Sequence, residues 1–84
     1  MDQRKEFLIR IQAAADEVLG EEAPRIHEAM ELGDETIDSL DLVEILMVIE
    51  DQEGFLIDAE HVSDVTNIGG LIDVLLERRT AEIA

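Results

Sequence analysis

The sequence predicts a small all-α domain: a bundle of three main helices plus one short helix. Three stretches repeat apolar side chains at the three- and four-residue spacing of an amphipathic helix. Glycine or helix-capping residues stand at their ends, and no segment shows the strict alternation of a half-buried strand. With 84 residues, no repeat and no linker, the chain is expected to form a single domain over residues 1–84.

The first predicted helix covers residues 3–19. Phe7 and Ile11 fall on its buried face, and Gly20 ends it. The connection over residues 20–38 has no sustained apolar stripe. Four apolar side chains are expected to fix it to the core: Ile26, Met30, Leu32 and Ile37. A connection of this length in a small domain is usually functional.

The second predicted helix begins at Ser39 and runs to about residue 52, with Asp38 as its N-cap and Gly54 after its end. At 3.6 residues per turn, four side chains fall within one arc of about 100° and define its core face: Leu42, Ile45, Leu46 and Ile49. The other side combines three acids with three apolar residues: Asp41, Glu44, Asp51, Leu40, Met47 and Val48. Such a face is typical of a docking surface, although isolated surface hydrophobes are also common.

A short helix is expected over residues 59–64. Thr66 or Asn67 then caps the last helix, whose buried stripe consists of Ile68, Leu71, Ile72, Leu75 and Leu76. Arg78 and Arg79 are expected in the last turn of this helix, where cations interact favourably with the helix dipole.

The charge is strongly negative and unevenly distributed. Twenty-two acids and six bases give a net charge of −16, and residues 26–77 contain fifteen Asp or Glu but no Lys or Arg. Nucleic acid would be repelled, whereas basic partner proteins would be attracted. The alternative is an acidic surface that serves only solubility.

Several classes of site are excluded or not expected. The absence of cysteine excludes disulfides and zinc-thiolate sites. No apolar run approaches the roughly 20 residues of a membrane span, and the N-terminus lacks the pattern of a signal peptide, so a cytoplasmic monomer without membrane contact is expected. Loops that start at Asp34 or Asp51 lack the Gly and Glu of a calcium-binding EF-hand, and no metal site is predicted.

Ser39 is the candidate for chemistry. It is one of two serines and stands where a helix begins, so backbone N–H groups would favour an attached phosphate. The alternative is that Ser39 merely caps the helix. Catalysis is not expected, because no G-x-S-x-G elbow surrounds Ser39, and His27 and His61 lie in the loop and the short helix.

The order of short motifs is the most specific signal. Residues 38–40 read Asp-Ser-Leu and residues 41–44 read Asp-Leu-Val-Glu. Downstream, residues 49–51 read Ile-Glu-Asp, residues 57–58 read Ile-Asp and residues 65–68 read Val-Thr-Asn-Ile. In this order, and at this length and charge, the chain resembles the acyl carrier protein family, the phosphopantetheine-bearing carriers of fatty acid and polyketide synthesis.

The resemblance implies a four-helix-bundle carrier that is not an enzyme. Ser39 would receive 4′-phosphopantetheine from coenzyme A through a phosphopantetheinyl transferase, which makes the protein a phosphoprotein. Acyl intermediates would then be held as thioesters and delivered to synthase and transferase enzymes that have basic docking patches.

The resemblance also assigns surfaces. Six positions match those that similar carriers use to meet partner enzymes: Leu40, Val43, Glu44, Met47, Glu50 and Asp51. Together with Asp38, Asp41 and Val48 they form the predicted docking face. In such carriers the cargo can retreat between the helices, and five residues are candidates for that cavity: Leu46, Ile57, Val62, Ile68 and Leu71.

Two departures from the family pattern leave the cargo open. Residues 34–37 extend the loop between Gly33 and the attachment motif, and Glu53 stands where an aromatic residue commonly precedes the glycine. Phe55 follows Gly54 instead. The alternatives are a carrier of amino acids, as in peptide synthetases or D-alanine transfer, and an acidic interaction module without a cofactor.

Overall fold

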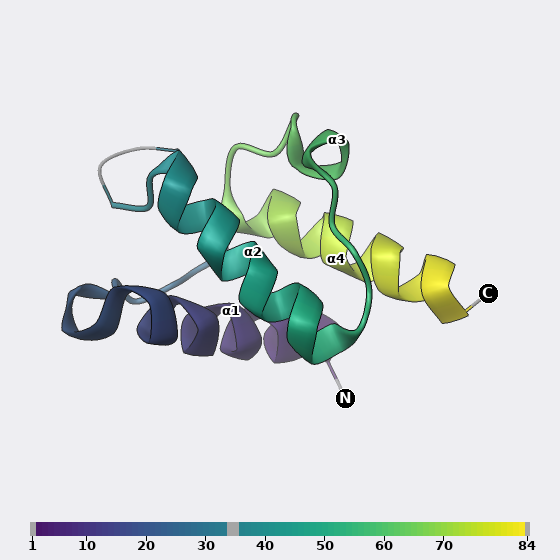
Figure 1. Ribbon diagram of the computed structural model, residues 1–84, viewed down its shortest axis with the longest axis horizontal. Helices are drawn as coiled ribbons and strands as arrows, with labels where there is room; N and C mark the ends of the chain where they lie inside the picture. Colours follow the sequence, from purple (N-terminus) through teal and green to yellow (C-terminus); the bar gives the residue numbers. More distant parts are fainter. Residues whose placement is uncertain (1, 34–35, 84) are drawn as a thin grey trace.

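The computed structural model describes residues 2–33 and 36–83. Its elements follow the predicted order: α1 (Gln3–Leu19), a 3-10 turn η1 (Gly20–Glu22), α2 (Ser39–Glu53), α3 (Ala59–Val62) and α4 (Ile68–Ile83). Helix α1 packs against both α2 and α4, and the short α3 packs on α4 (Figure 1). The described residues contain no strand, only an isolated bridge between Glu31 and Asn67. The predicted all-α bundle is therefore confirmed.

Local capping fixes the ends of α1 and α2. The carboxylate of Asp2 accepts hydrogen bonds from the first turn of α1, and Gly20 ends this helix at a φ of 65°. Gly54 ends α2 in the left-handed conformation, at a φ of 79°, and its N–H donates to the carbonyl of Glu50. Both glycines adopt backbone angles that residues with a side chain rarely occupy.

The core is aliphatic apart from two phenylalanines. Phe7 and Ile11 of α1 lie in it with Ile45 and Ile49 of α2, each at most 1% exposed. Phe55, which follows Gly54 directly, is also buried. Most residues of the predicted core faces are thus buried, whereas Leu42 of α2 and Leu76 of α4 are half-buried against the core.

The long connection is packed and hydrogen-bonded along most of its described length. Ile26 and Ile37 are buried, as predicted, and Met30 and Leu32 are half-buried against the core. The N–H of Leu32 donates to the carbonyl of Thr66 at 2.9 Å, and the carbonyl of Met30 accepts from the N–H of Ile68 at 2.9 Å. Of the predicted loop extension, Asp34 and Glu35 lie outside the described residues.

The start of α4 rests on the same connection. Asn67, rather than Thr66, is the cap, because its side-chain oxygen accepts from the N–H of Gly70 at 2.8 Å. The N–H of Gly69 donates to the carbonyl of Glu28 at 2.8 Å. A Cβ atom at position 69 would stand 3.3 Å from that carbonyl oxygen, so glycine permits the close approach of the two segments.

Arg4 joins three parts of the bundle. Its guanidinium pairs with Glu28 of the connection and Asp73 of α4, and donates to the carbonyl of Gly69 at 3.1 Å. The hydrogen bond with Glu28, followed by that with Asp73, raises the pKa of Arg4 above its ordinary value. The N-terminal turn of α1 is thereby tied to the start of α4.

Two predicted boundaries were wrong. The short helix ends at Val62 rather than at residue 64, because Ser63 and the residue after it form a turn. Helix α4 continues to Ile83, so Arg78 and Arg79 lie before its last turn, which contains no basic residue. These two arginines instead contact other segments: the guanidinium of Arg78 donates to the carbonyl of Leu56 at 3.1 Å, and Arg79 forms ion pairs with acids of α1 and α2.

Candidate cofactor attachment site

Ser39 is the first residue of α2, and its side chain is exposed. The N-cap is Asp38, whose backbone is extended and whose carboxylate accepts from the N–H of Asp41 at 2.8 Å. The capping alternative for Ser39 therefore fails, since Asp38 already fills that role. Within the described residues the hydroxyl of Ser39 has no hydrogen-bond partner.

The helix end beside Ser39 can hold an anion. The carboxylate of Asp38 accepts a hydrogen bond from the N–H of Asp41, and the carbonyl of Asp38 accepts one from the N–H of Leu42. The N–H groups of Ser39 and Leu40 have no acceptor in the described part of the chain. Two unpaired N–H groups at a helix N-terminus suit the oxygens of a phosphodiester attached to the adjacent hydroxyl. The residues present thus fit a phosphate-linked group.

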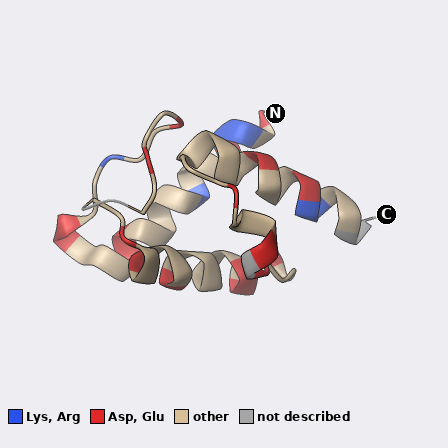
Figure 2. Ribbon diagram, turned by 90° about the horizontal axis from the view of Figure 1, so that it is seen from above, with Lys and Arg blue, Asp and Glu red and all other residues tan. Residues whose placement is uncertain are grey.

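An acidic and apolar face runs down α2 from this point. Leu40, Val43 and Met47 are 68%, 52% and 60% exposed. Glu44 and Asp51 are exposed beside them. In Figure 2 the acids are spread along the helices and loops, whereas Lys and Arg are few and occur only before residue 26 and after residue 77 of the sequence. The part of α2 that is exposed therefore offers apolar contact area within a negative field.

Four of the predicted docking residues are half-buried or already engaged in a hydrogen bond within the chain. Val48 is half-buried and packs against the core, so the buried arc of α2 is wider than the four residues that the sequence suggested. Asp38 is engaged as the N-cap, and Asp41 is half-buried. Glu50 is half-buried as well, and its carboxylate accepts from the N–H of Ile57 at 2.8 Å.

An apolar pocket of about 240 Å³ opens between α2 and α3. Seven residues line it: Leu42, Val43, Leu46, Met47, Glu50, Ile57 and Val62. Three of the predicted cavity residues, Leu46, Ile57 and Val62, are among them. Ile68 and Leu71 are not, because both belong to the core stripe of α4 and are 1% and 0% exposed.

Apart from Leu46, the sequence did not reveal the α2 wall of this pocket. Val43, Met47 and Glu50 were assigned to docking alone, and Leu42 to the core. Their spacing along one side of the helix was a usable signal, but an exposed apolar stripe on a helix indicates a docking surface as readily as a pocket wall.

The wall formed by α3 is held by hydrogen bonds at its start. The ring Nδ1 of His61 accepts from the N–H of Asp58 at 2.9 Å, and the N–H of His61 donates to the carbonyl of Asp58 at 2.9 Å. His61 is thus a capping residue of α3. His27 lies exposed in the connection. In the described residues neither histidine ring forms a hydrogen bond with Ser39, so neither is placed to act as its base.

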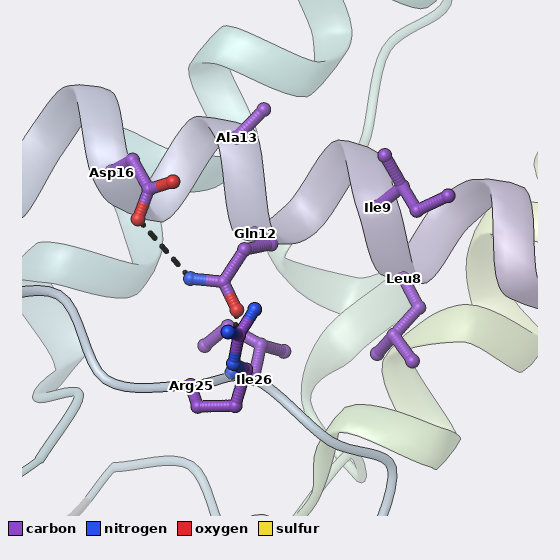
Figure 3. A pocket seen from close by; sticks show the side chains of 7 residues that line it. All are labelled: Leu8, Ile9, Gln12, Ala13, Asp16, Arg25 and Ile26. Carbon is purple, nitrogen blue, oxygen red and sulfur yellow. Dashed lines mark hydrogen bonds between the residues drawn. The ribbon is translucent and has the colours of Figure 1, made fainter.

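A second groove, of about 480 Å³, lies between α1 and the start of the connection (Figure 3). The amide of Gln12 fixes its shape: the NH₂ group donates to Asp16 at 3.1 Å and to the carbonyl of Pro24 at 2.9 Å, and the oxygen accepts from the N–H of Ile26 at 2.7 Å. No predicted site residue lines this groove.

Two further findings concern other kinds of site. No three His, Asp or Glu side chains of the described residues gather in a group that could hold a metal ion. None of the helices in the described ranges has the length and hydropathy required to cross a bilayer.

Comparison with known proteins agrees with this geometry. Residues 10–75 match the family described as "Phosphopantetheine attachment site". The acyl carrier protein of Rubrobacter xylanophilus is 35% identical over 79 residues, which cover 93% of this chain and 98% of that protein. The acyl carrier protein of Saccharopolyspora erythraea is 32% identical over 75 residues, which cover 88% of this chain and 79% of that protein. No solved structure matches the chain.

Proposed function

Because this chain belongs to the phosphopantetheine-attachment family and is a non-catalytic, acyl-carrier-like protein, we propose that Ser39 bears the cofactor and that the cargo comes from fatty acid or polyketide synthesis. The observation that carries the proposal is the exposed hydroxyl of Ser39, without a partner in the described residues, at the start of α2.

Each residue around the attachment point has a separate task. The hydroxyl oxygen of Ser39 forms a bond to the phosphorus of the phosphopantetheine half of coenzyme A, and the adenosine bisphosphate half leaves. The hydroxyl proton passes to a base of a separate phosphopantetheinyl transferase. Asp38 fixes the first turn of α2, which holds the hydroxyl outward. The N–H groups of Ser39 and Leu40 offset the repulsion between the new phosphodiester and the nearby carboxylates.

When bound, 4′-phosphopantetheine supplies a terminal thiol, which a chain without cysteine does not have. The pocket between α2 and α3 provides a place for an apolar cargo. It begins at Leu42, about 4.5 Å along the helix axis from Ser39, and reaches Glu50, about 17 Å along it. Six of its seven lining side chains are apolar. Burying a methylene group there contributes about 0.8 kcal/mol, which favours acyl over aminoacyl cargo.

The partner enzymes are expected to present basic patches to α2. The exposed Leu40, Val43 and Met47 supply contact area, and Glu44 and Asp51 supply the charge that attracts such patches. A cofactor-free interaction module, the third possibility that the sequence left open, is not supported by the family match.

Intact-mass spectrometry tests the proposal. The chain is incubated with coenzyme A and a broad-specificity phosphopantetheinyl transferase. The wild type and Ser63→Ala, which alters the other serine, should each gain one phosphopantetheinyl group, whereas Ser39→Ala should gain none. No gain in the wild type, or a gain that persists in Ser39→Ala, contradicts the assignment.

A further inference from the structure

A second apolar surface lies on α1, apart from the attachment site. Ile9 is 69% exposed, and together with Leu8 and Ala13 it lines the groove of about 480 Å³ between α1 and the start of the connection (Figure 3). Ile26, which is only 4% exposed, forms part of the same groove. A single exposed hydrophobe needs no explanation, but a branched aliphatic beside a groove with a buried apolar wall offers contact area to a partner.

The groove lies on the side of α1 that faces away from the core. Phe7 and Ile11 belong to the buried face of this helix. At about 100° per residue, Ile9 is rotated by about 160° from each of them. The residues that line the groove belong to α1 and the connection, and none belongs to α2. A helix bound in the groove therefore leaves Ser39 and the exposed face of α2 uncovered.

The end of the groove beside η1 is negatively charged. Asp16 lines the groove, and three exposed carboxylates follow it along the chain: Glu17, Glu21 and Glu22. Arg25 also lines the groove, and within the described residues it forms no ion pair. Four carboxylates and one guanidinium give this end a net charge of −3. Basic side chains of a partner are attracted here, whereas Arg25 repels any base placed directly beside it.

We propose that this groove is a second docking surface, and that its occupant is a basic amphipathic helix of a partner protein. The apolar stripe of that helix covers Leu8, Ile9 and Ala13, and lysines or arginines at the edge of the stripe pair with Asp16 and the carboxylates that follow it. Because α2 stays accessible, the chain can remain bound to this partner while other enzymes dock beside Ser39. This last consequence rests on the proposed function, whereas the docking surface itself does not.

An NMR titration of the full chain tests the docking surface. The probe is a synthetic helical peptide with a stripe of leucines that is flanked by lysines. Because α2 is acidic as well, the peptide is expected to bind there too, and the two surfaces are followed by separate amide signals. Ala13 and Arg25 report on the groove, and Glu44 and Met47 report on α2. Saturable shifts at both pairs are expected, and their absence at Ala13 and Arg25 overturns the proposal.

Three variants separate the apolar contact from the charge. Ile9→Ser should raise the dissociation constant at the groove roughly tenfold and leave that at α2 unchanged. Leu56→Ser is the matched control, because Leu56 is also 69% exposed but lines neither this groove nor the pocket between α2 and α3. Arg25→Gln should lower the dissociation constant at the groove about threefold, since it removes the local positive charge. Equal constants in Ile9→Ser and Leu56→Ser, or weaker binding in Arg25→Gln, overturn the proposal.

Because the chain contains no cysteine, each surface can be blocked separately. Ala13→Cys and Met47→Cys are alkylated with the same bulky maleimide, and loading of Ser39 by a phosphopantetheinyl transferase is followed by intact mass. The block at position 13 should leave the loading rate within about twofold of the wild type, whereas the block at position 47 should slow it on the order of tenfold. Equal slowing overturns the independence of the two surfaces. Failure of the unblocked wild type to load contradicts the proposed function, and the peptide titration then still decides whether the groove binds a helix.

Discussion

Glu53 and Arg79 lie 26 positions apart in the sequence, and their side chains meet at 2.6 Å. The carboxylate of Glu53 is 8% exposed and also pairs with Arg10 at 3.3 Å, so the end of α2 is joined to both α1 and α4. The guanidinium of Arg79 lies 4.1 Å from the centre of the Phe7 ring. Burial acts to lower the pKa of Arg79, but hydrogen bonding to Glu53 and the charge of that carboxylate raise it above its ordinary value. Glu53 therefore has two arginine partners at the edge of the core.

Glu53→Gln should destabilise the fold, because two arginines lose a shared charged partner. The expected loss in free energy of unfolding is about 1.5–3 kcal/mol, the contribution of a hydrogen bond to a charged group. Urea denaturation measures it, with Glu44→Gln as the control that removes one exposed carboxylate. Equal stability of the two variants would show that the cluster adds nothing to the fold.

Asp38→Ala should weaken the first turn of α2, since the N–H of Asp41 loses its acceptor. The expected cost is about 1 kcal/mol. Asp38→Asn removes the same charge but retains a capping oxygen, so it should remain closer to the wild type. Denaturation midpoints compare the three proteins. A result in which Asn is as destabilising as Ala would mean that charge, rather than capping, explains the effect.

Gly69 and Gly70 should respond differently to alanine. Gly70→Ala should stabilise the protein by about 0.5–1 kcal/mol through helix propensity. Gly69→Ala should show no such gain, because its Cβ would stand 3.3 Å from the backbone oxygen of Glu28. Thermal unfolding distinguishes the pair. Equal stabilisation by both would indicate that the backbone around Glu28 shifts away from the new Cβ atom without loss of stability.

Reversing the charges of Glu44 and Asp51 to lysine should weaken association with a basic partner and leave the helical content nearly unchanged. Loading by a phosphopantetheinyl transferase under limiting enzyme should slow on the order of tenfold at low salt. Reversal of Glu21 and Glu22, exposed residues of η1, changes the net charge equally and serves as the control. Identical slowing in both double variants would assign the effect to net charge and not to the α2 face.

Added salt should stabilise the fold, because a net charge of −16 makes the folded chain repel itself. The melting temperature should rise between about 0.01 M and about 0.15 M ionic strength, where the screening length falls from about 30 Å to about 8 Å. Magnesium chloride should act in the same direction. Differential scanning calorimetry provides the test, and a melting temperature indifferent to both salts would argue against self-repulsion.

Local patterns were sufficient for the helices and for the position of Ser39. Residue spacing identified the core faces of α1, α2 and α4, and Asp38 and Gly54 marked the limits of α2 within one residue. Helix propensity and capping depend on neighbours three or four positions away. Such contacts can be read from the chain itself.

Boundaries that depend on distant partners were predicted less well. Helix α4 continues past Arg78 and Arg79, whose side chains contact Leu56 and Glu53 rather than the end of their own helix. Nothing within a few residues of either arginine marks these partners. The shorter α3 likewise depends on how the chain turns back toward α4.

The sequence by itself determined an aliphatic helical bundle, the motif around Ser39 and an acidic second helix. Only the tertiary structure decided that Glu50 reaches Ile57, that Val43 and Met47 line a pocket as well as a surface, and that Ile68 and Leu71 belong to the core and not to the pocket. The physical reason is that periodicity and capping are local, whereas a pocket wall arises from the distance and rotation between helices, which depend on how the whole core packs.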